Sequence, residues 1–316
     1  MNRIQPSDRI KVLAVVVAYV PDTKVLQALL DSLLAQTAGV FVVDNSPAND
    51  RRVEILCAGF PRDTLRLIRL EKNLGVARGL NVGIDAALAA EATHVLLSDQ
   101  DSLPAANMVS GLQQVLTELV EAKLKIGAIG PTYTDLHTKK TFPFKAIIPG
   151  KFFPGEIFSS EKNPIVDALS LITSGTLIPV NVFKEVGLMR EDFFIDRVDT
   201  EWCLRARSHG FMLFGTIRAS MYQRMGEHAL RVWYGTWRQV SSYIPIRVYY
   251  QIRNSIYMWR LNYVPLRWKI RNTWYAFGVA YSHIFFGRQK RAGLHMSWHG
   301  FVDGLLGRMG QYHDQR

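Results

Sequence analysis

The first 130 residues of this 316-residue chain alternate short apolar runs with longer stretches in which apolar residues recur at helical spacing. The short runs are typical of buried strands, and the longer stretches are typical of amphipathic helices. Strands that alternate with helices are joined by right-handed crossovers. We therefore predict an α/β fold with a doubly wound, mostly parallel sheet and helices on both faces. The expected strands are Ile10–Ala18, Val40–Val43, Leu65–Leu70, His94–Ser98 and Ile126–Gly130, and the expected helices are Thr23–Gln36, Arg51–Ala58, Val76–Ala90 and Pro104–Lys123.

The rest of the chain is less regular at first and then becomes helical. Residues 131–162 are expected to form a loop or a hairpin over the functional site. The pattern over Val166–Val180 predicts a strand, a turn and a strand. Asp199–His209 has the spacing of a helix that ends at a glycine, and Phe211–Ile217 is the strand expected after it. From Ser241 onward the pattern is helical.

The charge is unevenly distributed along the chain. The formal net charge is +11, but residues 203–316 hold 17 basic and three acidic residues, while residues 1–202 carry a net −3. The C-terminal third also holds six of the seven Trp and ten of the twelve Tyr residues. Two regions with such different surfaces face different surroundings. We predict a substrate-binding α/β domain over 1–240 and a basic, aromatic-rich helical region over 241–316.

Composition excludes several classes of protein. With 48% hydrophobic and 21% charged residues, the chain is typical of a globular protein and not of a disordered or collagen-like one. Cys57 and Cys203 form neither a zinc spacing nor a redox pair, which indicates reduced cytoplasmic thiols. Val12–Val20 resembles a signal peptide core but ends at a turn with no cleavage site. Trp274–Gly287 is shorter than the roughly 20 residues of a membrane-spanning helix.

Polar side chains follow each of the first four predicted strands. Tyr19 follows the first strand, Asp44 the second, Asn73 the third, and Asp99 and Asp101 the fourth. In open parallel sheets, ligands bind beyond the carboxyl ends of the strands. Polar loops end strands in any such fold, but a pair of carboxylates directly after an apolar strand is harder to explain that way.

Asp99 and Asp101 are separated by one residue. Two carboxylates this close repel each other unless a cation lies between them. Mg²⁺ and Mn²⁺ accept one or two carboxylates together with phosphate oxygens. The pair at the fourth strand tip therefore indicates a site for a metal ion and a nucleotide diphosphate, and a solvated acidic turn is the alternative.

The common glycine-rich nucleotide motifs are missing. Neither GxGxxG nor GxxxxGK[ST] occurs, which argues against a nicotinamide-binding domain and a P-loop nucleotidase. Gly75, Gly79 and Gly83 recur at four-residue spacing, with Asn73 and Arg78 among them. The glycines either let a helix pack closely on the sheet or form a turn that offers amides and an arginine to phosphates.

Five ordered blocks of sequence resemble the inverting glycosyltransferases of family 2, which have a GT-A type fold. The last block resembles the rhamnosyltransferase branch of that family, and the resemblance covers roughly residues 10–230. It implies a nucleotide-sugar donor, dTDP-L-rhamnose, and an acceptor in cell-surface polysaccharide synthesis. The blocks are Val16–Tyr19, Val42–Ser46, Asn73–Gly83, Ser98–Asp101 and Phe194–Arg207.

The resemblance implies roles for the strand-tip residues. Asp44 stands where the family holds the base of the donor, and a carboxylate can accept a hydrogen bond from a ring N–H. Asp101 stands at the position of the family's principal ligand for the metal ion, Mg²⁺ or Mn²⁺. Asp99 stands nearer the ribose and the diphosphate of the donor. The full set of expected donor-binding residues is Tyr19, Asp44, Asn73, Arg78, Asp99 and Asp101.

Asp199 stands at the position of the family's catalytic base, with Glu201 ranked second. Inversion requires a group that accepts the proton of the acceptor hydroxyl on the face opposite the departing diphosphate. The alternative role for Asp199 is that of an acidic residue that stabilises a helix N-terminus. Both roles are compatible, because a helix N-terminus favours the ionised carboxylate.

Other matching positions imply contacts to the acceptor or the diphosphate. Thr173 and Ser174 resemble an acceptor-side turn, and Arg253 resembles an arginine that contacts the donor or a lipid-linked pyrophosphate; a surface arginine is the alternative. Where the branch has a histidine before a glycine, this chain has Gln223, a weaker ligand for a transition metal. His228 is the nearest substitute.

The basic C-terminal region favours attachment to an anionic membrane surface. Interfacial aromatics and headgroup-binding arginines fit such a surface, and so does a lipid-linked saccharide acceptor. A protein partner is an alternative. Nucleic acid is not expected, because no binding motif occurs. The prediction is thus a cytoplasmic enzyme peripheral to the inner face of the cell membrane. A family 2 transferase for N-acetylhexosamine or galactofuranose, and a non-catalytic sugar-nucleotide binder, are the alternatives.

Overall fold

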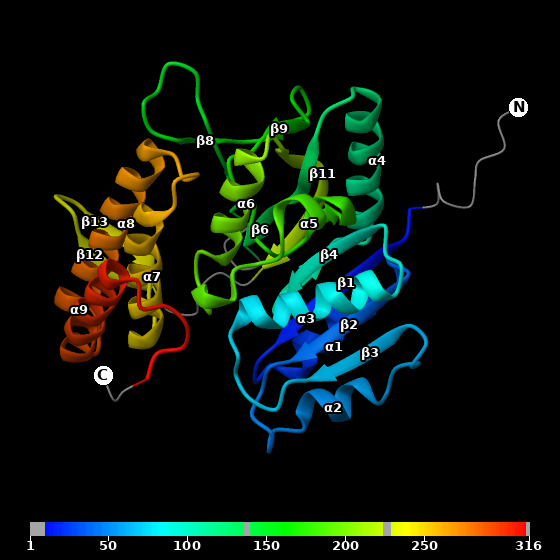
Figure 1. Cartoon of the computed structure of the whole chain (residues 1–316), viewed down its shortest axis with the longest axis horizontal. Helices are drawn as coiled ribbons and strands as arrows, with labels where there is room; N and C mark the ends of the chain where they lie inside the picture. Colours follow the sequence, from blue (N-terminus) through cyan, green and yellow to red (C-terminus); the bar gives the residue numbers. More distant parts are fainter. Residues whose placement is uncertain (1–9, 136–139, 224–228, 314–316) are drawn as a thin grey trace, which may run out of the picture.

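The computed structural model describes residues 10–135, 140–223 and 229–313, and we describe only these. One large twisted sheet forms the centre of the molecule (Figure 1). Helices cover both of its faces, and a group of C-terminal helices lies at one end of the molecule, at the left in Figure 1.

The sheet has the order β3-β2-β1-β4-β10-β6-β11-β5, with β9 paired to β11. β1 pairs in parallel with both β2 and β4, while β10 runs antiparallel between β4 and β6. The predicted mostly parallel sheet is therefore confirmed, with β10 antiparallel inside it and the short strands β5 and β9 antiparallel to β11. The strands are β1 (Val12–Ala18), β2 (Gly39–Asp44), β3 (Leu65–Arg69), β4 (His94–Asp99), β5 (Ser102–Pro104), β6 (Ile126–Asp135), β9 (Ile165–Asp167), β10 (Thr176–Pro179) and β11 (Met212–Gln223).

Alternate residues of β1 belong to two different hydrophobic cores. Val16 packs in the core under α1, α2 and α4, and Val15 packs in the core under α3, α5 and α6. A strand buried on both faces needs apolar residues at every position, which explains its unbroken run. The helices are α1 (Thr23–Leu34), α2 (Arg52–Cys57), α3 (Val76–Ala89), α4 (Met108–Glu121), α5 (Val180–Val186) and α6 (Val198–Ser208).

Gly79 and Gly83 bring α3 into close contact with β1. A Cβ atom on Gly83 would lie 2.2 Å from Val15 Cγ1, and one on Gly79 would lie 2.7 Å from Val17 Cγ1. Of the two interpretations of this glycine repeat, close packing of a helix on the sheet thus accounts for Gly79 and Gly83.

We expect Gly83→Ala to destabilise the protein by about 1–3 kcal/mol, because the added methyl group must displace the packed Val15 side chain. Gly278→Ala is the matched control. It also lies within a helix, but its Cβ would meet its nearest atom, the hydroxyl of Tyr234, at 3.5 Å. Urea denaturation compares the free energies of unfolding, and equal values for the two variants would contradict the expectation.

The C-terminal region packs as helices against the α/β part of the molecule. The β12–β13 hairpin precedes α7, which packs against both α8 and α9. Met258 and Trp268 join the core that contains α3, so this region shares a core with the α/β part. The elements are β7 (Phe144–Ala146), β8 (Gly155–Ile157), β12 (Ala229–Trp233), β13 (Trp237–Ser241), α7 (Pro245–Tyr257), α8 (Leu266–Phe285) and α9 (Lys290–Leu306).

Candidate active site

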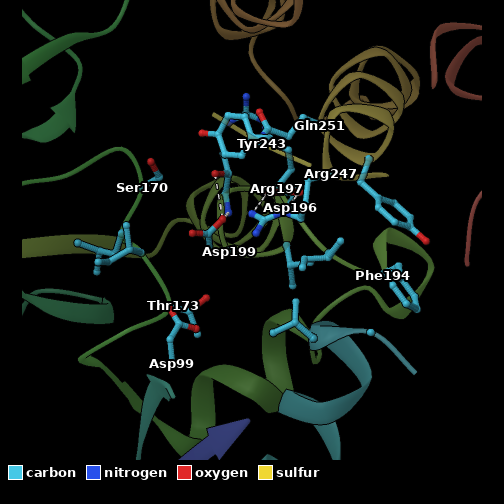
Figure 2. Close-up of a pocket in the computed structure, with 18 of the residues that line it drawn as sticks. Asp99, Ser170, Thr173, Phe194, Asp196, Arg197, Asp199, Tyr243, Arg247 and Gln251 are labelled. Carbon is cyan, nitrogen blue, oxygen red and sulfur yellow. Dashed lines mark hydrogen bonds and ion pairs between the residues drawn. The ribbon is translucent and has the colours of Figure 1, made fainter. Parts of the chain in front are cut away.

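A cavity of about 1250 Å³ lies where the strand tips meet the C-terminal helices. The tips of β1 and β4 line one part of it, and α6, α7 and α8 line another. Figure 2 shows Asp99 and Asp199 turned toward the same space. The predicted residues that line the cavity are Tyr19, Asn73, Asp99, Asp101, Thr173 and Asp199.

Asp99 is held at the tip of β4 by a chain of hydroxyl groups. Its backbone N–H donates to Ser174 Oγ at 2.7 Å, and Ser174 Oγ lies 2.6 Å from Ser102 Oγ. Burial, together with the charges of Asp101 and Asp199, raises the pKa of Asp99 to about 7. Carboxylates that repel each other around one cavity favour a bound cation.

Asp199 lies in the first turn of α6, and one of its carboxylate oxygens is already occupied. Thr200 donates to Asp199 Oδ1 from its backbone N–H at 2.6 Å and from its hydroxyl at 3.2 Å. Burial raises the pKa of Asp199, against these bonds and the nearby charge of Arg197. The helix N-terminus was expected to favour the ionised form of Asp199, but the effect of burial on the pKa is larger. A raised pKa makes a carboxylate a stronger base.

The segment before Asp199 adopts an unusual backbone. Phe194, Asp196 and Arg197 have φ values of 64°, 62° and 66°, in the left-handed region that non-glycine residues rarely adopt. Arg247 of α7 donates two hydrogen bonds to the Asp196 carboxylate, at 2.8 and 2.6 Å (Figure 2). Backbone strain of this kind concentrates at functional sites.

The end of the cavity at the tips of β1 and β4 is built from short polar contacts. The Tyr19 N–H donates to Gln100 Oε1 at 2.6 Å, which ties the tip of β1 to that of β4. Asn45 accepts from the Leu74 N–H at 2.8 Å and lies beside Asn73, which also lines the cavity. Asn45 was not singled out by sequence reasoning, although it follows a strand tip.

Asp44 is fully buried beside this end. Its Oδ1 accepts from the Ser46 N–H at 3.0 Å, and its Oδ2 forms an ion pair with Arg69 Nε at 3.4 Å but no hydrogen bond with any described residue. A carboxylate oxygen that is ion-paired but not hydrogen-bonded is able to accept from a ring N–H. The structure does not place Asp44 on the cavity wall, so its contact with the donor base stays a prediction.

Comparison with known proteins gives the family. Residues 10–225 match the model of the family described as glycosyltransferase like family 2. The chain belongs to this family. This glycosyltransferase is 29% identical over 299 residues to the dTDP-rhamnosyl transferase RfbF of Shigella flexneri, an alignment that covers 93% of this chain and 95% of the relative. The resemblance to the rhamnosyltransferase branch is therefore confirmed.

Solved structures confirm the GT-A type fold of the glycosyltransferase. A mannosyltransferase from Pyrobaculum calidifontis, solved with GDP-Man and Mn²⁺, matches with a TM-score of 0.55 at 15% identity over 97% of this chain and 78% of that chain. Residues 1–349 of TarS from S. aureus, solved with UDP-GlcNAc, match with a TM-score of 0.53 at 16% identity over 93% of this chain and 79% of that chain. At these identities the likeness shows the fold alone.

Like Asp44, the predicted ligand-binding residues Arg78 and Glu201 of this glycosyltransferase lie outside the cavity wall. Arg78 pairs with Glu191 at 2.9 Å and does not line the cavity. Glu201 is fully buried, pairs with Arg205 at 2.8 Å and accepts from the Tyr263 hydroxyl. The expectation that Glu201 is a second candidate for the base, in contact with the acceptor, is corrected, because its carboxylate is committed inside the protein.

Arg253 is also corrected, from a ligand-binding residue to a structural one. Its guanidinium is buried and donates to the carbonyls of Phe193 at 2.8 Å and Asp192 at 3.3 Å, and also to that of Gly310. It therefore ties α7 to the segment before Asp199 and to the chain after α9. The surface position considered for this arginine is likewise wrong.

We expect Arg253→Ala to destabilise the glycosyltransferase by roughly 3–5 kcal/mol, because buried carbonyls lose a charged donor. Arg260→Ala is the control, since Arg260 is exposed and donates to a single carbonyl, that of Leu305. We expect that variant to lose less than about 1 kcal/mol. Chemical denaturation measures both, and a stable Arg253→Ala protein would refute the structural role.

The remaining metal candidates are only partly described. Gln223 ends β11, and His228 lies outside the described residues. Among the described ranges, no three His, Cys, Asp or Glu residues are grouped as a metal centre. Asp99 and Asp101 nevertheless fit a Mg²⁺ or Mn²⁺ ion whose other ligands are phosphate oxygens and water. Ser174 is fully buried behind Asp99, whereas Thr173 lines the cavity.

Proposed function

We propose that this glycosyltransferase moves L-rhamnose from dTDP-L-rhamnose to a saccharide hydroxyl with inversion, in cell-surface polysaccharide synthesis. The observation that carries the proposal is the convergence of Asp99, Asp101 and Asp199 on one cavity from separate parts of the chain. The likeness to RfbF, whose name states dTDP-rhamnosyl transfer, supports the choice of sugar.

Each residue has a role that its position supports. Asp101 and Asp99 would hold Mg²⁺ or Mn²⁺, which offsets the charge that develops on the departing dTDP. Asp199 accepts the proton of the acceptor hydroxyl as that oxygen bonds to the anomeric carbon of the sugar. The bond from that carbon to the diphosphate breaks on the opposite face. Tyr19, Asn73 and Asp44 lie at the end of the site where the nucleotide would bind.

A donor panel tests the choice of sugar. Purified protein with Mg²⁺ or Mn²⁺ is incubated with dTDP-L-rhamnose, UDP-N-acetylglucosamine, UDP-N-acetylgalactosamine and UDP-galactofuranose, and released nucleotide diphosphate is measured with and without saccharide acceptors. We expect release from dTDP-L-rhamnose to exceed release from the others. Preference for another donor sugar would refute the rhamnose assignment without affecting membership of the family. Donor binding without any release of nucleotide diphosphate would support a non-catalytic protein.

We also propose that α8 attaches the enzyme to an anionic membrane surface at the inner face of the cell membrane, where the acceptor would be lipid-linked. No described helix is long and apolar enough to span a membrane. Trp274 is 72% exposed, in a stripe of apolar residues that recur at helical spacing along the outer side of α8. Such a stripe, flanked by arginines, is typical of interfacial helices. Its exposed members are Leu266, Trp274, Phe277 and Phe285. Ile270 and Tyr281 lie between them and are half-buried, and the Tyr281 hydroxyl donates to the Trp233 carbonyl.

We expect the double substitution Trp274→Ser, Phe277→Ser to weaken binding to vesicles of phosphatidylglycerol and phosphatidylcholine by roughly tenfold or more, because two large side chains no longer enter the interface. Ile55→Ser is the control, since Ile55 is equally exposed on α2, far from α8 in Figure 1. Co-sedimentation measures the bound fraction. Equal binding by all three proteins, or binding indifferent to salt, would exclude this surface.

A further inference from the structure

Arg197 has a guanidinium that the protein leaves incompletely bonded. Its Nη2 atom is buried and has no hydrogen-bond partner among the described residues, and its Nε donates to Ser255 Oγ at a long 3.4 Å. The guanidinium lies 4.7 Å from the centre of the Tyr275 ring, on the cavity wall. A buried hydrogen-bond donor without a partner is energetically unfavourable. Its presence at a cavity therefore indicates a ligand that accepts the missing hydrogen bond.

Arg271 lines the same cavity, one turn of α8 before Tyr275. Residues four apart on a helix lie on one face, so Arg271 lies beside the ring on which Arg197 stacks. Within the described part of the chain, Arg271 has no hydrogen bond or ion pair. Glu156 interacts with it electrostatically but is already paired with Lys145. Two arginines thus present uncommitted donors to one stretch of wall.

This part of the cavity wall lies on the side of Asp199, the proposed catalytic base, where the acceptor would bind. Asp199 interacts electrostatically with Asp99 on one side and with Arg197 on the other. Figure 2 shows the same order, with Asp199 between Asp99 and Arg197. Because a donor diphosphate at Asp99 and the attacking hydroxyl lie on opposite sides of the transferred sugar, Arg197 lies beyond the attacking hydroxyl.

The acidic groups nearby do not neutralise the two arginines. Both carboxylate oxygens of Asp196 accept from Arg247, and one oxygen of Asp199 accepts from Thr200. The wall therefore keeps positive charge that faces the cavity. Guanidinium groups bind phosphate oxygens through paired N–H donors, in preference to neutral sugar hydroxyls.

We propose that Arg197 and Arg271 bind a phosphate or diphosphate group carried by the acceptor. The inference rests on the proposed transferase function and deepens it, because it gives the acceptor a chemical class: a saccharide joined to an anionic phosphate. A lipid diphosphate and a soluble sugar phosphate share this chemistry.

The experiment measures binding of geranyl diphosphate to the full chain by calorimetry, with dTDP and Mg²⁺ at saturation so that the donor end is filled. We expect Arg197→Gln and Arg271→Gln each to weaken this binding by roughly tenfold or more. Arg267→Gln is the matched control, because Arg267 lies on the same helix and packs over the Phe152 ring. We expect it to bind as the wild type does. Thermal unfolding checks that each variant is folded. If Arg197→Gln does not fold, Arg271→Gln alone tests the proposal.

A parallel titration with inorganic pyrophosphate identifies the source of the phosphate. Tighter binding of geranyl diphosphate supports a lipid-linked acceptor, and equal binding supports recognition of phosphate alone. The proposal is overturned if Arg271→Gln weakens binding no more than Arg267→Gln, or if geranyl diphosphate binds only when dTDP is left out, which would place that ligand at the donor end. Failure of dTDP itself to bind the wild type would instead refute the proposed function.

Discussion

Replacing Asp199 with asparagine should lower the rate of sugar transfer by about 10²–10⁴-fold while dTDP binding stays within a factor of about two. Asparagine keeps the shape of the side chain and its contact with Thr200 but cannot accept the proton of the acceptor hydroxyl. Asp199 also lies in the first turn of α6, so a purely structural role would lower stability and leave the rate per folded molecule intact.

Single-turnover kinetics and calorimetric titration with dTDP measure these two quantities separately. Asp85→Asn is the control, because Asp85 is an exposed aspartate on α3 outside the cavity wall. We expect it to transfer at the wild-type rate. A wild-type rate in Asp199→Asn would remove Asp199 from the mechanism.

The second large effect is expected at the strand tip. Asp101→Ala should weaken dTDP binding in Mg²⁺ by roughly 10–100-fold, because one of the two carboxylates proposed to hold the cation is lost. With EDTA present, the variant should bind dTDP as well as the wild type or more tightly, since the carboxylate then has no cation to hold and only repels the diphosphate. Loss of a negative charge beside a diphosphate would by itself strengthen binding.

The direction of the change in dTDP affinity therefore distinguishes an Asp101 that holds a metal ion from an Asp101 that only repels the diphosphate. Calorimetry with and without Mg²⁺ gives four dissociation constants, and the proposal needs weakening in Mg²⁺ only. Unchanged or tighter binding by Asp101→Ala in Mg²⁺ would exclude the metal assignment, whatever the fold family suggests.

Periodicity was enough to predict the α/β part of the fold. Alternating strands and helices allow only a few sheet topologies. The uninterrupted apolar run of β1 indicates a strand that is buried on both faces of the sheet. Because parallel strands end at one edge, the polar residues that follow them, Asp99 among them, were predicted to converge. A strand in the region of β10 was predicted, but its antiparallel direction was not, since a four-residue strand carries no signal of its direction.

The sequence by itself therefore determined the family, the layered sheet and the carboxylates at its edge, because these depend on local spacing and ordered motifs. Only the tertiary structure decided which charged groups stay available. Arg253 and Arg197 are both arginines near aromatic residues. Arg253 is bonded to backbone carbonyls, whereas Arg197 has a donor with no partner in the described part of the chain. The difference lies in partners brought from distant elements: a guanidinium acts on a ligand only when the fold leaves its hydrogen bonds unfilled.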